Sequence, residues 1–376
     1  MLRWVNGVSR LNELIKGMCP DGVEYVSLED VCLISKGVQF NKKDMNDTGT
    51  YPVINGGVNP SGYIEQYNQE ENTITISQGG ASAGFVNWLE TKFWAGAHCY
   101  ILKPTDNVLN RYLFHFVKSK EYKLQECQYG AGIPALAKST VASLKIPVPP
   151  IEIQSEIVYI LDNFTELTSK LTEELSAELT ARKKQYEYYR DKLLTFDCTI
   201  DKIRIKDVAN IYRGKRVVKS DLSENGEYAV YQNALSPMGY YNSKNRNGGS
   251  VYLIAAGAAG SIGFSENDFW AADDCYTFEC NEKITQKYLF YVLLNNQSLI
   301  NSKVRKASIP RISKESIENI EIPLPSLDVQ NRLVDVLDNF NSLCNDLTKG
   351  LPAEIEMRIK QYEYYRDSLL NFKMMN

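Results

Sequence analysis

The sequence predicts an α+β protein in which two pseudo-symmetric α/β domains are separated by two long antiparallel, coiled-coil-like helices. Three observations lead to this prediction. The chain repeats itself once, each repeat ends in a long stretch with helical periodicity, and the rest of each repeat holds short β-rich runs between glycine turns. A length of 376 residues, with 44% hydrophobic and 23% charged residues, suits two or three folded domains.

The repeat is most evident in the heptapeptide QYEYYRD, which occupies 185–191 and returns 176 residues later at 361–367. The same offset relates LDNF at 161–164 to 337–340, IPVP at 146–149 to IPLP at 322–325, and Ile133-Pro134 to Ile309-Pro310. Farther towards the N-terminus the matches are fainter and the offset drifts by a few residues. Each half therefore has a divergent globular part and a closely matched tail. This difference indicates that the two tails have the same function, whereas the globular parts have related functions on different targets.

Both tails have the apolar periodicity of a helix with one continuous stripe. The stripe of the first tail consists of Ile157, Ile160, Phe164, Leu167, Leu171, Leu175, Leu179, Tyr186, Tyr189, Leu193 and Phe196. The second has Leu333, Val336, Phe340, Leu343, Leu347, Leu351, Ile355, Tyr362, Tyr365, Leu369 and Phe372 at the equivalent positions. We expect the two helices to bury these stripes against each other, as coiled coils do. The candidate packing residues are Leu171, Tyr186, Tyr189, Leu347, Tyr362 and Tyr365.

Proline at position 352, in Gly350-Leu351-Pro352, interrupts the second tail, so its helix is expected to consist of two segments. About 46 residues at roughly 1.5 Å each would make the first tail a rod of nearly 70 Å, which predicts a spacer role. We divide the chain into a helical segment (1–19), two globular domains (20–150 and 198–326) and two helical spacer regions (151–197 and 327–376).

The globular domains contain the β-rich runs TITIS and VYLIA, each followed by a glycine cluster, at 78–85 and 256–264. A helical stretch follows in each, at 112–125 and 288–302. The glycine clusters lack the spacing of a phosphate-binding P-loop or a dinucleotide site, so tight turns close to a bound backbone are the better interpretation.

A net charge of −4 requires that any contact with DNA come from local clusters of cations. Such clusters recur at matched places in both halves, beside Asn and Gln side chains that can read base edges. A solvated surface would explain any one of them alone, but their recurrence favours contact with DNA. The candidate DNA-binding residues are Lys36, Lys42, Lys43, Gln78, Lys138, Arg213, Lys215, Arg216, Lys219, Arg305, Lys306, Arg311 and Lys314.

Catalytic and metal-binding patterns are missing from the sequence. The only Pro-Pro pair, Pro149-Pro150, is flanked by Val148 and Ile151, which is a helix-start signal rather than the segment of an adenine methyltransferase. The eight cysteines form no CxxC pair, and we expect each of the two histidines to be a structural or surface residue. We therefore expect no catalytic residue, metal or cofactor in this chain, and a reduced, cytoplasmic location without a signal peptide or membrane span.

With the duplication, the IPxP segments before Gln154 and Gln330, and the QYEYYRD helices, the sequence resembles the specificity subunits of type I restriction-modification systems. The resemblance covers almost the whole chain, and its specific part is the paired helices. It implies a DNA-binding, non-catalytic subunit with two target recognition domains, which reads a bipartite site in host defence and DNA methylation. It also implies two methyltransferase subunits as partners and the ability to recruit restriction subunits. Those partners would use S-adenosylmethionine, ATP and Mg²⁺.

Two other function classes fit part of the sequence. A helical adaptor that binds only proteins would explain the tails but leaves the duplicated basic, glycine-rich domains without a role. A catalytic enzyme of an unrecognised type is the weaker alternative, because no catalytic pattern is present. Neither the DNA sequence recognised nor the length of its spacer can be read from these residues.

Overall fold

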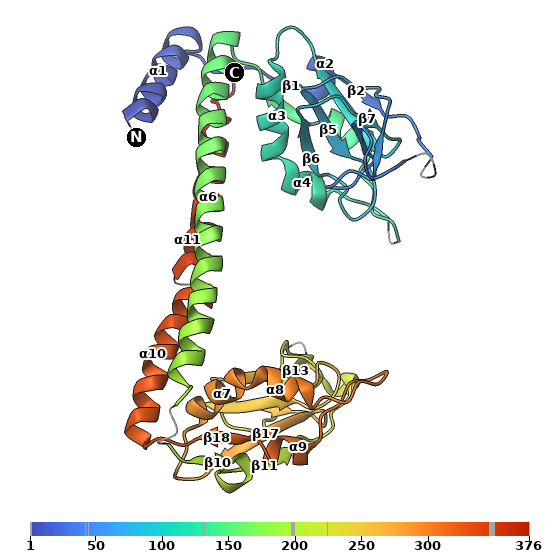
Figure 1. Cartoon of the computed structure of the whole chain (residues 1–376). Helices are drawn as coiled ribbons and strands as arrows, with labels where there is room; N and C mark the ends of the chain where they lie inside the picture. Colours follow the sequence, from blue (N-terminus) through green and yellow to red (C-terminus); the bar gives the residue numbers. More distant parts are fainter. Residues whose placement is uncertain are drawn as a thin grey trace. The chain divides into compact units, whose positions relative to one another are not determined.

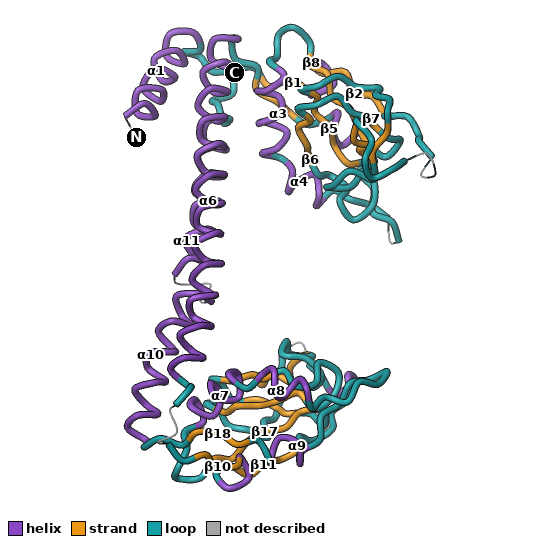
Figure 2. The backbone as a smooth tube through the Cα atoms, in the orientation of Figure 1, coloured by secondary structure: helices purple, strands orange, loops and turns teal. Residues whose placement is uncertain are grey.

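The computed structural model describes residues 2–41, 43, 45–130, 132–196, 200–223, 225–345 and 350–375. The chain forms two compact units, which we describe separately (Figure 1). Unit 1 consists of Met1–Glu174 and Ile355–Asn376, and unit 2 consists of Leu175–Glu354. Helices and short-stranded sheets alternate in both units, which confirms the predicted α+β class (Figure 2).

Unit 1 contains a four-stranded antiparallel sheet in the order β2-β8-β5-β6 and a three-stranded sheet in the order β4-β3-β7. The strands of the larger sheet are β2 (Cys32–Lys36), β8 (Cys99–Pro104), β5 (Thr73–Ser77) and β6 (Val86–Leu89). Those of the smaller sheet are β4 (Tyr63–Ile64), β3 (Tyr51–Ile54) and β7 (Trp94–Ala95), and β3 pairs with β7 in parallel. A separate pair joins β1 (Tyr25–Ser27) to β9 (Lys145–Pro147).

In unit 1, α3 packs against β5, β6 and β8 of the larger sheet, and the other helices complete the unit. The helices of this unit are α1 (Leu2–Met18), α2 (Leu28–Val31), α3 (Asn110–Ser119), α4 (Glu121–Glu126), α5 (Lys138–Ala142) and parts of α6 (Ile151–Leu193) and α11 (Gly350–Leu369). Alternation along β8 divides its side chains between two cores: Tyr100 and Leu102 lie in the main core with α3, whereas Cys99 and Ile101 lie in a smaller core with β3 and β7. Strand β5 is buried along its whole length because both of its edges and both of its faces are covered.

Unit 2 repeats this topology. Its larger sheet has the order β11-β17-β14-β15, formed by β11 (Ala209–Arg213), β17 (Cys275–Cys280), β14 (Ser250–Ile254) and β15 (Ile262–Ser265). Its smaller sheet consists of β13 (Gly239–Tyr241), β12 (Tyr228–Tyr231) and β16 (Phe269–Ala271), and β10 (Lys202–Arg204) pairs with β18 (Glu321–Pro323). The helices are η2 (Ile205–Asp207), η3 (Lys219–Asp221), α7 (Gln286–Asn295), α8 (Gln297–Ser302), α9 (Lys314–Glu318), α10 (Leu327–Asn345) and the remaining parts of α6 and α11. The duplication seen in the sequence is thus a duplication of structure.

The tails form helices that pack in pairs, as predicted. The first tail is the single helix α6, and the second consists of the two helices α10 and α11. In unit 1, Phe164 of α6 contacts Tyr362 and Tyr365 of α11, with ring centroids 6.2 and 5.6 Å apart. In unit 2, Tyr189 of α6 contacts Phe340 of α10, with centroids 6.3 Å apart. By the repeat offset, the contacts of Phe164 with Tyr365 and of Phe340 with Tyr189 are the same contact made twice.

Three details of the sequence prediction are corrected. The apolar stripes are not buried throughout, because Leu167 is 63% exposed, Val336 is 43% exposed and Tyr189 is also exposed. A pair of helices covers only the side of each stripe that faces the partner, so residues at its flank keep their contact with solvent. The helical stretches expected at 112–125 and 288–302 are each two helices, with breaks at Lys120 and Asn296.

The last residues of the chain complete unit 1. Leu370 is buried in its main core, the hydroxyl of Tyr25 donates to the carbonyl of Phe372 at 3.0 Å, and Val23 forms a parallel bridge with Met374. Leu194, the repeat equivalent of Leu370, is buried in the main core of unit 2. Each unit is therefore completed by the end of a tail helix that begins in the other half of the sequence.

Candidate nucleic-acid interface

A buried glutamine fixes each globular domain to its helix. Gln154, at the start of α6, accepts a hydrogen bond from the amide of Leu109 at 2.9 Å and donates to the carbonyls of Asn107 and Pro149 at 2.9 and 2.8 Å. Its side chain is fully buried, so all of these bonds replace bonds to water. The loop before α3 and the start of α6 are consequently held in one geometry.

Gln330 at the start of α10 makes the same three bonds in unit 2. It accepts from the amide of Thr285 at 3.0 Å and donates to the carbonyls of Lys283 and Pro325 at 2.8 and 2.9 Å. Every partner lies 176 residues after its counterpart in unit 1. The glutamine after each IPxP segment therefore clamps each globular domain to the start of its tail helix.

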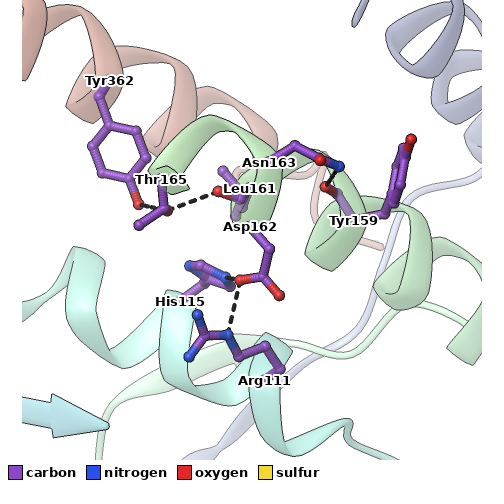
Figure 3. Close-up of polar contacts among 8 residues, drawn as sticks. All are labelled: Arg111, His115, Tyr159, Leu161, Asp162, Asn163, Thr165 and Tyr362. Atoms are coloured by element: carbon purple, nitrogen blue, oxygen red, sulfur yellow. Dashed lines mark hydrogen bonds and ion pairs between the residues drawn. The ribbon is translucent and has the colours of Figure 1, made fainter. Parts of the chain in front are cut away.

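A second polar junction, in unit 1, links α3 to α6 (Figure 3). Asp162 lies 2.8 Å from both Nε of Arg111 and Nε2 of His115, whose side chain is 1% exposed. Burial lowers the pKa of His115, so the neutral ring donates from Nε2 to the carboxylate. Burial alone would raise the pKa of Asp162, but the hydrogen bonds from His115 and Arg111 outweigh it and the pKa is lowered. His115 is thus structural, as expected.

Unit 2 keeps the geometry of this junction but changes its chemistry. Asp338 replaces Asp162, Lys287 Nζ lies 3.0 Å from it, and the hydroxyl of Tyr291 donates to it in place of His115. Burial raises the pKa of Tyr291, so this hydroxyl stays protonated where His115 would titrate. The junction of unit 1 thus contains a histidine, whose pKa is lowered by burial, where the junction of unit 2 contains a tyrosine.

The glycine-rich turn of unit 1 lies against a second loop, and we name the residues that meet there the first loop cluster: Gln78, Gly79, Gly80, His98, Tyr129, Pro134 and Ala135. The amide of Gln78 donates to the carbonyl of His98 at 2.9 Å, and that of Gly80 donates to Pro134 at 2.8 Å. Tyr129 and Ala135 form an antiparallel bridge with two bonds of 2.9 Å. Gly80 has φ +84°, so this turn requires glycine.

The second loop cluster, in unit 2, has the same backbone pattern and consists of Ala255, Ala256, Gly257, Asp274, Arg305, Pro310 and Arg311. The amide of Ala255 donates to Asp274 at 2.7 Å, and that of Gly257 donates to Pro310 at 3.1 Å. Arg305 and Arg311 form the equivalent bridge, and Gly257 has φ +86°. The backbones of the two clusters are alike, whereas almost every side chain differs.

A glycine after β2 and another after β11 let the chain pass close to the backbone at the end of β7 and of β16. A Cβ on Gly37 would lie 2.2 Å from the carbonyl oxygen of Gly96, and one on Gly214 would lie 2.1 Å from that of Ala272. No other residue permits this approach. Lys36 and Arg213 immediately precede these glycines, and Arg213 lies beside the second loop cluster, with its guanidinium 3.8 Å from Asp274.

The structure distributes the predicted DNA-binding residues over each domain as follows. Gln78 belongs to the first loop cluster, and Arg305 and Arg311 belong to the second. Lys138 and Lys314 are the first residues of α5 and α9, three residues after the cluster bridges. Exposed side chains without a cluster contact are those of Lys43, Lys215, Arg216, Lys219 and Lys306, and Lys42 lies outside the described residues.

Two of these cations are held within the chain. Nε of Arg213 donates to the carbonyl of Asp273 at 2.6 Å and its guanidinium lies 3.8 Å from Asp274, while Lys314 pairs with Glu318 at 3.3 Å. The sequence reasoning missed the bridge residue Tyr129 and the exposed His98, both of which lie in the first loop cluster. The offset of 176 residues between Tyr129 and Arg305 is the signal that could have identified the first of them.

The helix pair of unit 1 carries a groove lined by residues of α6 and α11, among them Leu171, Leu167, Tyr159 and Tyr365. Leu171 is half-buried there, Tyr186 is buried in the main core of unit 2, and the ring of Tyr362 stacks on that of Phe164. Leu347 lies outside the described residues. Tyr188 and Tyr364, which are equivalent in the repeat, are 61% and 71% exposed.

The described residues contain no group of three or more His, Cys, Asp or Glu side chains that could hold a metal ion. Within the same part of the chain, no helix has the length and apolar character needed to span a membrane. The thiols of Cys19, Cys32, Cys99, Cys127, Cys275 and Cys280 are free.

Comparison with known proteins identifies the family. The sequence model of the type I restriction modification DNA specificity domain matches residues 20–181 and again 199–357. The chain belongs to this family.

The similarity to individual specificity subunits extends over nearly the whole chain. A putative type I restriction enzyme specificity subunit of Haemophilus influenzae is 30% identical, with 98% of this chain and 99% of the relative covered. The specificity subunit of the EcoR124I/EcoR124II type I restriction enzyme of Escherichia coli is 29% identical over 97% of both chains.

Solved structures share the fold. A chain from a structural study of complex assembly and conformational transition in the type I restriction-modification system matches with a TM-score of 0.67, covering 93% of this chain and 98% of that chain at 16% identity. The HsdS subunit of Thermoanaerobacter tengcongensis matches with a TM-score of 0.51 at 15% identity, covering 95% and 99%. These matches confirm the predicted fold.

Proposed function

We propose that this type I specificity subunit is a non-catalytic DNA reader in which each loop cluster recognises one half of a bipartite site. The observation that carries the proposal is the pair of loop clusters, which share a backbone and differ in side chains. A shared backbone presents side chains to DNA at the same places. Different side chains select different bases, because sequence is read through contacts to base edges.

Cations kept in both units contribute the part of the affinity that does not depend on sequence. Lys36 and Arg213 precede the matched glycines, and Lys138 and Lys314 begin the matched helices α5 and α9. Lys215 and Arg216 follow Gly214, are exposed, and form none of the ion pairs seen among the described residues; the corresponding segment of the first half has its lysines a few residues later, at positions 42 and 43. Phosphates are alike along DNA, so cations that bind them belong at equivalent places in both halves.

The helices are proposed to hold the partners, two methyltransferase subunits, and to recruit restriction subunits. The equivalent exposed tyrosines Tyr188 and Tyr364, together with Leu167 in the groove of unit 1, supply apolar surface that the helix pairs leave uncovered. S-adenosylmethionine, ATP and Mg²⁺ would then be used by those partners, in the cytoplasm where host DNA is accessible. This chain would contribute specificity and no catalytic group.

An exchange of one recognition domain tests the proposal. Residues 200–326 are replaced by the equivalent domain of a related subunit, and the methylated motif is mapped by long-read sequencing of host DNA with the methyltransferase partner present. We expect one half-site to change and the other to stay. A simultaneous change in both half-sites would contradict independent reading by the two domains.

The competing function, an adaptor that binds only proteins, has its own test. A gel-shift assay with the assembled methyltransferase complex distinguishes an adaptor from a specificity subunit. It compares the complex without this chain, with this chain, and with this chain after its loop clusters have been altered. An adaptor would leave the DNA affinity and the methylated motif unchanged when the loop clusters are altered. A specificity subunit would not.

A further inference from the structure

We propose that the bridge between Arg305 and Arg311 is a guanine-reading element of the second recognition domain, whose place in the first domain is taken by the uncharged pair Tyr129 and Ala135. This inference rests on the proposed function and assigns one base contact within it. Both arginine side chains are exposed, and none of the ion pairs among the described residues involves either of them.

The geometry of the bridge places two like charges side by side. The amide of Arg305 donates to the carbonyl of Arg311 at 2.8 Å and the amide of Arg311 donates back at 3.2 Å, so the two residues are directly opposite each other. Side chains at such positions start about 5 Å apart on the same face, and like charges there destabilise the pairing. An electronegative ligand that accepts from both guanidinium groups removes this cost.

The loop that carries the arginines, which follows α8 (Figure 1), is fixed on both sides of Arg311. Gly257 donates to Pro310 at 3.1 Å, and the amide of Ile312, directly after Arg311, donates to Ala255 at 2.9 Å. The backbone beneath the arginines therefore does not need to be ordered when DNA binds. Less conformational entropy is lost, and the direction in which the side chains leave the backbone is set in advance.

Comparison of the two units distinguishes a base from a phosphate as the ligand. A phosphate contact is needed in both half-sites, and the equivalent pairs Lys36 and Arg213, and Lys138 and Lys314, are cationic in both units. The bridge is cationic in unit 2 alone, which is the behaviour expected of a contact that depends on the target sequence. Among bases, guanine presents the two acceptors O6 and N7 in the major groove. The two parallel N–H donors of a guanidinium group, the arginine fork, match these acceptors.

The experiment compares the assembled complex of this chain and its methyltransferase partners with the variants Arg305→Ala, Arg311→Ala and the double variant. Motif mapping on host DNA first defines the wild-type site. We expect the double variant to lose discrimination by about 5- to 150-fold at one G·C pair of one half-site, and to keep the other half-site. The dependence of binding on salt should change little, because the lost contact is to a base.

The conservative variants Arg305→Lys and Arg311→Lys keep the charge but lose the fork. If the arginines read a base, the lysine variants should lose discrimination at the same G·C pair. If the arginines contact a phosphate, lysine should replace them without that loss. Lys306→Ala, at an exposed cation beside the bridge, controls for the loss of one charge, and a thermal melt checks the fold of each variant.

The outcomes separate this inference from the function on which it rests. If the double variant keeps its motif while the salt slope falls by about one unit for each arginine, the arginines bind phosphate and the assignment is overturned. Binding and motif that do not change at all overturn it as well. Failure of the wild-type complex to methylate a defined motif would instead contradict the proposed function.

Discussion

Nε2 of His115 on α3 lies 2.8 Å from the carboxylate of Asp162 on α6, so the orientation of the first recognition domain on its helix depends on a group that can be protonated. Burial lowers the pKa of His115, whereas an unfolded chain has an ordinary histidine. The unfolded state therefore binds the proton more tightly, and the stability contributed by the neutral ring is lost as pH falls below about 6.5.

From this relationship we expect unit 1 to lose stability as the pH falls from 7.5 to 5.5. The variant His115→Tyr, made with Arg111→Lys, gives unit 1 the junction of unit 2, where Tyr291 stays protonated over this range. Thermal melts at several pH values measure the effect. The double variant should show a weaker pH dependence than the natural chain, and an equal dependence in both would contradict the assignment to His115.

The glutamine clamps should matter equally in the two units. Gln154→Ala leaves the amide of Leu109 and two carbonyls without their partner, which should destabilise unit 1 by about 2–4 kcal/mol. Gln330→Ala should do the same in unit 2. Hydrogen exchange read separately over α3 and α7 should rise only in the unit that carries the change. Asn163→Ala serves as a control, because this exposed residue bonds only to the carbonyl of Tyr159 on its own helix (Figure 3).

The repeated aromatic contacts on the helices lead to a third prediction. Phe164→Ala removes the contacts with Tyr362 and Tyr365 and should lower the free energy of unfolding by about 1–3 kcal/mol. Phe340→Ala should have a similar effect through Tyr189. Leu167→Ala, at a stripe position that is 63% exposed, should change stability by less than about 0.5 kcal/mol. Denaturant melts of the three variants check this ranking. If Leu167→Ala lowered the free energy of unfolding as much as the other two variants, the conclusion that Leu167 lies at the exposed flank of the stripe would be wrong.

Replacement of both Lys215 and Arg216 by alanine should weaken binding to all DNA sequences by a similar factor. The salt slope of the assembled complex should fall by about 1 to 2 units, because both residues are proposed to contact phosphates. Binding is measured at several salt concentrations with target and non-target duplexes. Lys206→Ala, at an exposed lysine in η2, controls for the loss of net charge. An affinity that is unchanged at every salt concentration would remove the two residues from the interface.

The sequence predicted the features that depend on local pattern. The periodicity that ends in QYEYYRD predicted helices, Pro352 predicted the division of the second tail, and the offset of 176 residues predicted two alike domains. It did not predict that Leu167 is exposed, because periodicity shows which side of a helix is apolar but not how much of that side a partner covers.

The candidate site was harder to predict because it is made of loops brought together by long-range backbone bonds. Gln78 and His98 are joined through their backbones, and such a bond leaves no trace in residue type. Tyr129 was missed for a related reason, since candidate DNA-binding residues were chosen mainly by positive charge and a tyrosine in a turn has none. The arginines of the equivalent bridge were noticed only for their charge, and their pairing needed the structure.

Leu370 and Phe372 also have a consequence for how the protein is made. The ribosome synthesises the strands and α3 of unit 1 more than two hundred residues before Leu370 and Phe372. Leu370 is buried in the core of unit 1, and the carbonyl of Phe372 accepts a hydrogen bond from Tyr25. Unit 2, by contrast, has all of its residues once Glu354 has been added. The domain that emerges first from the ribosome thus completes its packing last. During translation its apolar surface stays uncovered, and exposed surface of this kind is what chaperones bind.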